Sequence, residues 1–521
     1  MASSHSQVPC AWFPRVSPPR PWNRRFPLQP SVVSQGPRFR RAKRQLTLSL
    51  TSLRALTLEI STPDRFDYLP PYPINPTVMT APPHLRHNQP PIDLLCGWPN
   101  PALLPAPDLL RSATTVLTTP SIAQPGLSYG PDEGYEPLRA HVAQWLENFY
   151  QPCHPISPGR ICITGGASQN LACVMAVFTD PVYTRAVWMV DPTYHLAGRM
   201  MDDAGFAGRV YGVPEDDEGI DLAFLENGLR AAEEKAHAEG NTEPKFKAPR
   251  PWRKIYKYII YAVPTFANPS TKVMSLGHRE RLIRLARQYD ALLVTDDVYD
   301  FLQWSPIAGG QLAAPEHACL PRLVDVDLYL DGGPVDEWGH TISNGSFSKL
   351  LGPGARTGWA EASEKVAYGI SQVGSSRSGG APSQLCATII DQLLPSGFLD
   401  THIQQVLQPA YAERYHRVLG AIQEYLVPLG VTVVSSSETV VGGYFIWVTL
   451  PPPLLAVDLV QRAQQEENLR LAPGTLFEAG SPQPPSDRFA GCLRLCFAWE
   501  EPRHLTEGVR RLARVLKRAL V

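Results

Sequence analysis

The sequence predicts an α/β protein, in which a large domain with a mostly parallel sheet, covered by helices on both faces, is joined to a smaller α+β domain. Short apolar runs at 160–164, 186–190, 257–263 and 291–295 have the length and composition of buried strands. Helical segments lie between them, such as 277–289, where apolar residues recur at helical spacing. This alternation of buried strands and helices is typical of a parallel sheet.

Changes in this pattern predict the domain boundaries. We expect the large domain to span 106–404 and the small domain to span 405–521. Residues 63–105 are expected to form an N-terminal arm and to complete the small domain.

The small domain and two irregular segments have their own signals. From about residue 405 a long helical pattern leads into strands within 431–449 and a terminal helix at 502–519. Residues 231–253, charged and then proline-containing, are expected to form an exposed insertion. Residues 305–340, with many Gly and Pro, are expected to form a long loop.

Composition excludes several classes of protein. At 521 residues the chain is long enough for two hydrophobic cores. A formal net charge of −1 argues against nucleic acid or an anionic membrane as the main partner, and no apolar run reaches the roughly eighteen residues of a transmembrane helix. The nine cysteines form no CxxC pair, so we expect no metal site. Four of them are expected in the core as reduced thiols, namely Cys96, Cys162, Cys173 and Cys496.

The N-terminus differs from the rest of the chain. The first 58 residues contain nine arginines, one lysine and no acid before Glu59. This bias fits a mitochondrial presequence, whereas the prolines between Pro9 and Pro37 oppose the amphipathic helix that such a signal needs. We expect 1–62 to be a basic leader, disordered or targeting, in a cytoplasmic or mitochondrial protein, and Met79 offers an alternative start.

The segment 346–359 combines a lysine with donors suited to a phosphate. A lysine that forms a Schiff base needs a confined polar site that suppresses its charge, and Lys349 lies among small hydroxyl residues. Ser346, Ser348 and Arg356 could direct donors to phosphate oxygens. Together they predict pyridoxal 5'-phosphate as the cofactor, and the alternative is a basic surface loop.

Further motifs support the first interpretation. They are 92–99, 127–139, 164–171, 191–194, 261–269, 295–299 and 493–497. In this order, with the lysine segment, they resemble the class I/II aminotransferases, which are fold type I pyridoxal-phosphate enzymes. The residues at 344–349 and 379–384 are most similar to those of the fungal-type and kynurenine/2-aminoadipate aminotransferase group.

The glycine turn at 165–168 is the expected phosphate cradle. It follows a predicted strand and opens a helix, so its main-chain amides face an anion. The resemblance implies that Ala167 donates its main-chain N–H and Ser168 its hydroxyl, beside the three donors of the lysine segment. Many relatives carry a hydroxyl residue at the position of Ala167, so one bond is missing here. The alternative is a plain strand-to-helix turn.

A carboxylate is expected beside the cofactor ring. Asp296 ends a predicted strand, where α/β sheets bind ligands. The resemblance implies that it keeps the ring nitrogen protonated, with Asp297 as its rival. It also implies that Tyr299 and Asn268 contact the phenolic oxygen and that Tyr194 stacks on the ring.

The expected substrate anchor is Arg494. An arginine in an apolar strand pattern is costly unless it is paired, and a substrate α-carboxylate could pair with it bidentately. The alternative is an edge-strand arginine in solvent. The resemblance adds Gly97 and Asn268 to this site, and implies that Tyr129 reaches the phosphate of a partner subunit in a homodimer with shared active sites.

The implied activity is ping-pong transfer of the amino group of an L-amino acid to a 2-oxo acid, with Lys349 moving the Cα proton as base and acid. A carbon–sulfur β-lyase or a cyclopropane-forming synthase has the same motifs, because the reactions diverge after Cα deprotonation. A pyridoxal-phosphate-sensing regulator would need a DNA-binding segment in front, and the first 90 residues show no pair of amphipathic helices. The substrate side chain is undetermined, and Tyr135 or Trp98 could line an aromatic pocket.

Overall fold

The computed structural model describes residues 89–377, 382–434, 439–480 and 487–521. The predicted leader, most of the predicted arm and Met79 lie outside the described residues, so the domain boundaries and the cellular location stay predictions. None of the described helices is long and apolar enough to cross a bilayer.

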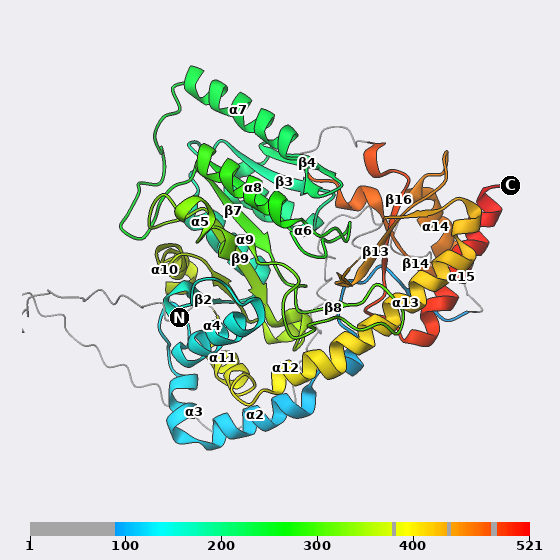
Figure 1. Ribbon diagram of the computed structural model, residues 1–521, viewed down its shortest axis with the longest axis horizontal. Coiled ribbons are helices and arrows are strands. Elements are labelled where there is room, and N and C mark those ends of the chain that lie inside the picture. Colours follow the sequence, from blue (N-terminus) through cyan, green and yellow to red (C-terminus); the bar gives the residue numbers. More distant parts are fainter. Residues whose placement is uncertain (1–88, 378–381, 435–438, 481–486) are drawn as a thin grey trace, which may run out of the picture. The chain divides into compact units, whose positions relative to one another are not determined.

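An eight-stranded sheet forms the centre of the described chain (Figure 1). Its strands, in spatial order, are β2 (Ile161–Thr164), β10 (Gly358–Glu361), β9 (Thr341–Ser346), β7 (Ala291–Asp296), β6 (Tyr258–Ala262), β3 (Ala186–Asp191), β4 (Val210–Asp216) and β5 (Gly219–Ile220). The pairs from β9 through β7, β6 and β3 to β4 are parallel. Strand β10 is antiparallel to both of its neighbours, and β5 is antiparallel to β4. The predicted mostly parallel sheet is therefore confirmed.

Helices cover both faces of this sheet because its strand residues alternate between two cores. Val187 and Met189 of β3 belong to one core, with helices α5, α6 and α10. Trp188 and Val190 belong to the other, with helices α7, α8 and α9. These helices are α5 (Ala167–Phe178), α6 (His195–Met201), α10 (Glu364–Ser371), α7 (Leu222–Ala238), α8 (Leu276–Tyr289) and α9 (Leu323–Val326).

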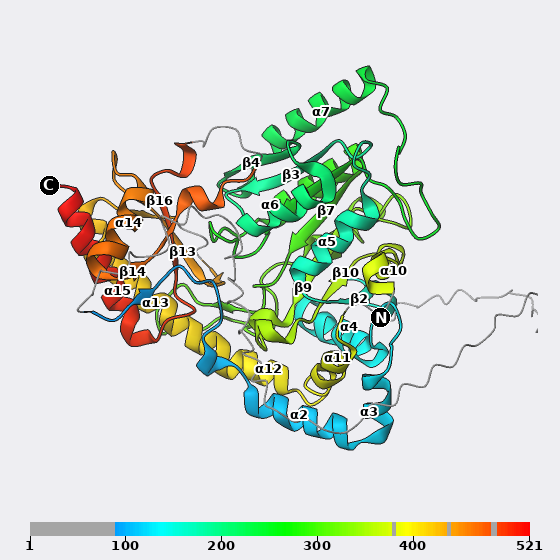
Figure 2. The ribbon, with the colours of Figure 1, turned by 180° about the vertical axis from the view of Figure 1, so that it is seen from behind.

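A second, antiparallel sheet lies in the C-terminal part, in the order β11 (Thr432–Val433), β13 (Phe445–Thr449), β16 (Cys492–Cys496) and β15 (Ala472–Pro473). Helices α13 (Gln408–Tyr425), α14 (Ala456–Glu467) and α15 (Pro502–Ala519) pack beside it (Figure 2). The short strand β1 (Ile92–Asp93) pairs in parallel with β14 (Leu469–Arg470). The start of the described chain therefore lies against its C-terminal part.

Further short elements connect the two sheets. Strand β8 (Gln303–Trp304) pairs with β12 (Val441–Gly442). The other α-helices are α2 (Ala106–Thr118), α3 (Pro120–Leu127), α4 (Glu136–Tyr150), α11 (Gln384–Asp391) and α12 (Phe398–His402). Figure 1 shows α12 and α13 as one long run that leads from α2 toward the C-terminal helices.

The predicted helices at 277–289 and 502–519 are confirmed, as α8 and α15. The predicted insertion at 231–253 is mostly exposed, and its first residues belong to α7, which continues to Ala238. Its Ala, Glu and Lys residues have high helix propensity, and Leu225 and Leu229 anchor it in the core. The predicted loop 305–340 contains α9 and the turn Leu330–Gly332. Cys96 is half-buried rather than in the core.

Candidate active site

The predicted site residues gather where the parallel strands end. Asp296 is the last residue of β7, and Ser346 is the last residue of β9. Gly165 follows β2, and Asn268 follows β6 by six residues. Strands β9, β7 and β6 are neighbours in the sheet, and β10 separates β2 from β9. The carboxyl ends of these four strands lie at one edge of the sheet, the usual ligand position in an α/β sheet, and this region is called the crevice below.

Lys349 lies in this crevice, at the end of the short turn η5 (Phe347–Lys349). Its Nζ donates to the main-chain oxygen of Gly97 at 2.9 Å. The ammonium is 5.6 Å from the ring centre of Tyr299 and 5.1 Å from that of Tyr444. Burial lowers the pKa of Lys349 to about 8, although the charge of Asp296 acts in the opposite direction. About a tenth of this amine is therefore uncharged at pH 7, far more than for an ordinary lysine, and the uncharged form is the nucleophile.

Asp296 faces the crevice with one oxygen unsatisfied. Its Oδ2 accepts a hydrogen bond from the Tyr261 hydroxyl at 2.9 Å. Its Oδ1 is buried and has no hydrogen-bond partner among the described residues. Burial raises the pKa of Asp296 to about 6, against the effect of the Tyr261 bond. A protonated pyridinium nitrogen would satisfy this oxygen, so the carboxylate fits the ring nitrogen of pyridoxal 5'-phosphate.

The rival carboxylate faces the opposite side of the strand. Asp297 accepts from the hydroxyls of Thr295 at 2.8 Å and of Ser343 at 2.5 Å. Its main-chain N–H donates to Asn344. The Asp297 side chain is thus bonded behind the sheet, away from Lys349.

The expected phosphate donors converge on the start of α5. Gly166 has φ of 98°, a left-handed conformation that favours glycine, and it precedes the first turn of the twelve-residue helix. Arg356 Nη2 donates to Gly165 at 2.8 Å, and a Cβ on Gly166 would lie 3.1 Å from the same nitrogen. The Ser346 and Ser348 hydroxyls are 2.9 Å apart. A helix N-terminus, a guanidinium and two hydroxyls fit a phosphate.

Tyr194 and Ser168 meet beside the cradle. A hydrogen bond from Ser168 reaches the Tyr194 hydroxyl, whose pKa burial raises to about 12. The charge of Asp296 also acts on this tyrosine. The structure therefore brings the predicted stacking residue to the same side of the site as Asp296.

Arg494 lies in β16 and is buried. Its Nη1 donates to Asn268 Oδ1 at 2.9 Å, and its Nη2 donates to the main-chain oxygen of Leu95 at 2.7 Å. The guanidinium lies 4.0 Å from the ring centre of Phe445 and 4.5 Å from that of Phe477. No carboxylate is among these contacts, so a buried cation is available for an incoming anion.

Tyr129 is not brought to Lys349. Its side chain is 88% exposed. It lines a groove of about 930 Å³ that also includes Gly165, Arg356 and Gln384. Tyr129 thus stands outside the crevice, on the side of the phosphate donors.

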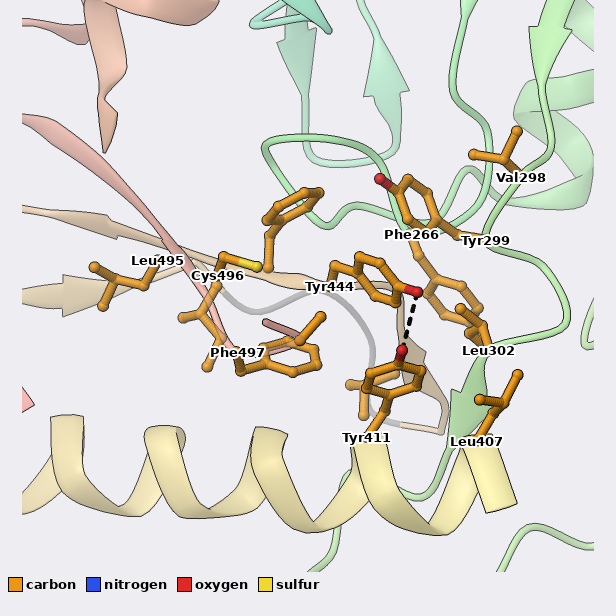
Figure 3. Close-up of a cluster of buried hydrophobic side chains, with 14 of the residues drawn as sticks. Phe266, Val298, Tyr299, Leu302, Leu407, Tyr411, Tyr444, Leu495, Cys496 and Phe497 are labelled. Atoms are coloured by element: carbon orange, nitrogen blue, oxygen red, sulfur yellow. Dashed lines mark hydrogen bonds between the residues drawn. The ribbon is translucent and has the colours of Figure 1, made fainter. Parts of the chain in front are cut away.

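The sequence did not predict two contacts near the site. Tyr261 opens the motif 261–269, where no role was expected of it, yet its hydroxyl donates to Asp296. Tyr444, labelled in Figure 3, lies in no motif, yet its hydroxyl donates to the main-chain oxygen of Lys349 at 3.2 Å. Of the two aromatic residues considered for a substrate pocket, Trp98 is 58% exposed and contacts Trp499 edge-on. Tyr135 packs on the core around α4.

The described residues contain no group of three or more His, Cys, Asp or Glu side chains that could hold a metal ion. The donors of the crevice are therefore a lysine, a carboxylate, hydroxyls and two arginines. This set matches a phosphorylated pyridine aldehyde and an amino-acid carboxylate.

Comparisons with known proteins agree with this chemistry. The model of the family "Aminotransferase class I and II" matches residues 109–512. An uncharacterized protein of Saccharomyces cerevisiae is 31% identical over 82% of this chain and 97% of its own length. The 2-aminoadipate transaminase of Thermus thermophilus is 30% identical over 81% of this chain and 89% of its own length.

Solved structures show the same relationship. The kynurenine aminotransferase of Pyrococcus horikoshii has a TM-score of 0.66 and 26% identity, over 83% of this chain and 92% of its own. The α-aminoadipate aminotransferase LysN of Thermus thermophilus, solved with N-(5'-phosphopyridoxyl)-L-leucine, has a TM-score of 0.63 and 29% identity, over 83% and 94%. The chain belongs to the class I and II aminotransferase family and is a fold type I, pyridoxal-phosphate-dependent transaminase.

Proposed function

We propose that Lys349 is the residue that binds pyridoxal 5'-phosphate covalently and that later moves the proton of the substrate. The observation that carries this proposal is the position of a buried amine, with a pKa of about 8, in the same crevice as the unsatisfied oxygen of Asp296. The Gly166 turn, Ser346, Ser348 and Arg356 would hold the phosphate, and Asp296 would hold the ring nitrogen.

The bound cofactor supplies an electron-withdrawing ring that makes the substrate Cα–H acidic. Arg494 would bind the α-carboxylate in place of its contact with Leu95 or Asn268 and so orient the Cα–H bond. The amine of Lys349 would take the Cα proton as a base and then, as an acid, give it to the former aldehyde carbon of the cofactor. Tyr194 would pack against one face of the ring and restrict its tilt.

We propose that the amino donor has a large, uncharged or weakly polar side chain. Phe445 and Phe477 flank the guanidinium of Arg494. His195 packs edge-on against Phe477, and burial together with the Arg494 charge lowers its pKa to about 4, so it is neutral at pH 7. Relatives named for kynurenine and for aromatic amino acids support such a donor, whereas another relative is named for 2-aminoadipate, whose side chain ends in a charged carboxylate.

The test is the absorption spectrum of the purified protein with single L-amino acids and no oxo acid. Conversion of the cofactor from its aldehyde band to its amine band, with one equivalent of 2-oxo acid, supports transamination and ranks the donors. Kynurenine, phenylalanine and 2-aminoadipate are compared with aspartate. An unchanged band while ammonia and pyruvate accumulate from cysteine conjugates would instead support the β-lyase.

We further propose a homodimer in which Tyr129 reaches the phosphate of the partner subunit. Support comes from the exposure of Tyr129 at 88% and of the nearby Leu127 at 67%, beside the groove that includes Arg356. Mixing inactive Lys349→Ala with weak Tyr129→Ala subunits, after unfolding and refolding together, should restore activity, since each mixed dimer then holds one intact site. No recovery in a mixture that forms dimers would contradict sharing.

A further inference from the structure

Two buried tyrosines connect Lys349 to a distant part of the chain. Tyr444 lies between β12 and β13, and Tyr411 lies on α13. Their hydroxyls are 3.1 Å apart, and Tyr444 donates to the Lys349 main-chain oxygen at 3.2 Å. Figure 3 shows the two hydroxyls facing one another, and the ring centre of Tyr299 lies 5.5 Å from that of Tyr444. Both side chains are fully buried.

The direction of these hydrogen bonds is fixed. A carbonyl oxygen can only accept, so the single hydrogen of Tyr444 is used on Lys349. Tyr411 must then donate to Tyr444. The main-chain N–H of Asn100 faces the Tyr411 oxygen and acts to lower the pKa of Tyr411. Hydrogen bonds therefore run in one direction from Tyr411 through Tyr444 to Lys349, and Asn100 lies at the far end.

The hydrogen-bond chain ends at the main-chain oxygen of Lys349, which has no partner within its own turn. Lys349 is the last residue of η5, where carbonyls lack partners within the turn. Tyr444 supplies that partner, and the Tyr444 ring lies 5.1 Å from the Lys349 ammonium. The lysine is therefore held at its main chain by Tyr444 and at its amine by Gly97.

The other end of the hydrogen-bond chain lies against the segment 93–100, which contacts both Lys349 and Arg494. Its Gly97 oxygen binds Lys349, and its Leu95 oxygen binds Arg494. The segment is itself secured by Asn100, whose Nδ2 donates to the main chain of Trp499 at 2.7 Å. A displacement of this segment is thus transmitted to Lys349 by two routes.

We propose that Tyr444 is a positioning residue for Lys349, and that the Tyr411–Tyr444 pair couples the seating of segment 93–100 to the lysine. The inference rests on the role proposed above for Lys349. Loss of the Tyr444 hydroxyl leaves the ring in place but leaves the Lys349 oxygen and the Tyr411 hydroxyl without their bond. The lysine turn and the segment 93–100 then move independently.

The test compares Tyr444→Phe and Tyr411→Phe with the matched control Tyr415→Phe. Tyr415 lies one turn further along α13 and packs on Trp304 and Phe497, outside the chain of hydroxyls. Amide hydrogen exchange of the cofactor-free protein is measured for the peptides 93–104 and 347–351. We expect faster exchange in both peptides for Tyr444→Phe and Tyr411→Phe, and no change for the control.

The loaded enzyme gives a second readout. For Tyr444→Phe we expect kcat to fall about tenfold, with a change in KM below about twofold, because a displaced lysine slows proton transfer more than substrate binding. The isotope effect with a Cα-deuterated donor should rise for the same reason. A purely structural contribution of Tyr444 would not raise it.

Equal behaviour of Tyr444→Phe and Tyr415→Phe in exchange and in kcat overturns the proposal. If Tyr444→Phe does not fold, Tyr411→Phe decides, and unchanged exchange at 347–351 in that variant overturns the coupling. Failure of the role proposed for Lys349 is separate. It would appear as covalent cofactor retained in Lys349→Ala after borohydride reduction, whatever the exchange data show.

Discussion

Asp296 and Asp297 are adjacent carboxylates at the end of one strand, but their surroundings are opposite. Asp296 opens on the crevice and keeps one oxygen without a partner among the described residues. Asp297 lies behind the sheet, bonded by Thr295 and Ser343. The alternation of strand side chains places the two groups on different sides.

A buried ion network lies behind the sheet, on the side of Asp297. Arg322 binds Asp325 through Nε at 3.0 Å and Nη2 at 2.9 Å, and binds Glu361 at 2.7 Å. Arg160 binds the second oxygen of Glu361 at 2.9 Å. The Arg322 guanidinium also lies 3.9 Å from the ring centre of Tyr150.

The difference separates stability from function. Behind the sheet, the charges of Arg322, Asp325 and Glu361 meet opposite charges, and Asp297 is bonded by two hydroxyls, so loss of these groups should destabilise the fold. In the crevice, Lys349, Asp296 and Arg494 meet neutral groups or no partner, so they are available to a cofactor and a substrate. Their replacement should remove activity while the fold survives.

The largest expected effect is in Asp296→Asn. An amide cannot hold the ring nitrogen protonated, so we expect kcat/KM to fall about 10³-fold. The melting temperature of the cofactor-free protein should stay the same or rise, because a buried, partly satisfied carboxylate is removed. Asp297→Asn is the matched control, in which activity per folded molecule is retained and stability falls. Lost stability in Asp296→Asn together with lost activity in Asp297→Asn would contradict the assignment of the two carboxylates.

Arg322→Met should have the largest effect on stability. It leaves Asp325 and Glu361 buried without their shared cation, which costs about 3 kcal/mol of unfolding free energy. Urea denaturation of the cofactor-free protein measures this loss. Activity per folded molecule should be close to that of the wild type, and a selective loss of activity would show that the network serves the site directly.

The pH dependence of cofactor capture distinguishes the effect of Asp296 on Lys349 from that of Asp297. The amine must be uncharged to react, and the pKa of Lys349 is lowered to about 8, so the capture rate should rise with pH and level off above about 8. The Asp296 charge raises this pKa, so Asp296→Asn should move the midpoint to lower pH. Asp297→Asn should leave it in place. Stopped-flow absorbance of the cofactor-free protein mixed with pyridoxal 5'-phosphate measures both.

The lowered pKa of Lys349 also makes the stability of the fold depend on pH. The folded pKa of Lys349 lies below its ordinary value of 10.5, so the folded state binds fewer protons than the unfolded chain between pH 8 and 10.5. The contribution of this residue to stability therefore increases with pH across that window.

Tyr261→Phe should have the smallest effect. The Tyr261 bond lowers the pKa of Asp296, which burial raises to about 6, so its loss should move the acidic limb of the kcat profile to higher pH. We expect about a fivefold loss of kcat at pH 7, which corresponds to about 1 kcal/mol, the net size of one ordinary hydrogen bond. An unchanged acidic limb would assign that limb to another group.

The sequence predicted the fold class, and the family resemblance implied that Lys349, Asp296 and Arg494 share one site, because each lies in a local motif. Of the three, only Asp296 was expected at the end of a predicted strand. It left Asp296 and Asp297 as rivals, since the choice depends on which face of β7 meets the crevice. The contacts of Tyr444 could not be predicted from the sequence, because its partners are 33 and 95 residues away in the chain. The contact of Asn268 with Arg494, across 226 residues, likewise needed the packing of the two sheets.

The segment 93–100 contacts Arg494 and Lys349 through main-chain oxygens, those of Leu95 and Gly97. An alanine scan does not detect such contacts, because an alanine substitution keeps the main-chain carbonyl of the residue. The importance of this stretch would therefore be underestimated by any library built from single substitutions. Insertion or deletion of one residue, or replacement of a peptide bond by an ester, is the kind of change to which the site should be most sensitive here.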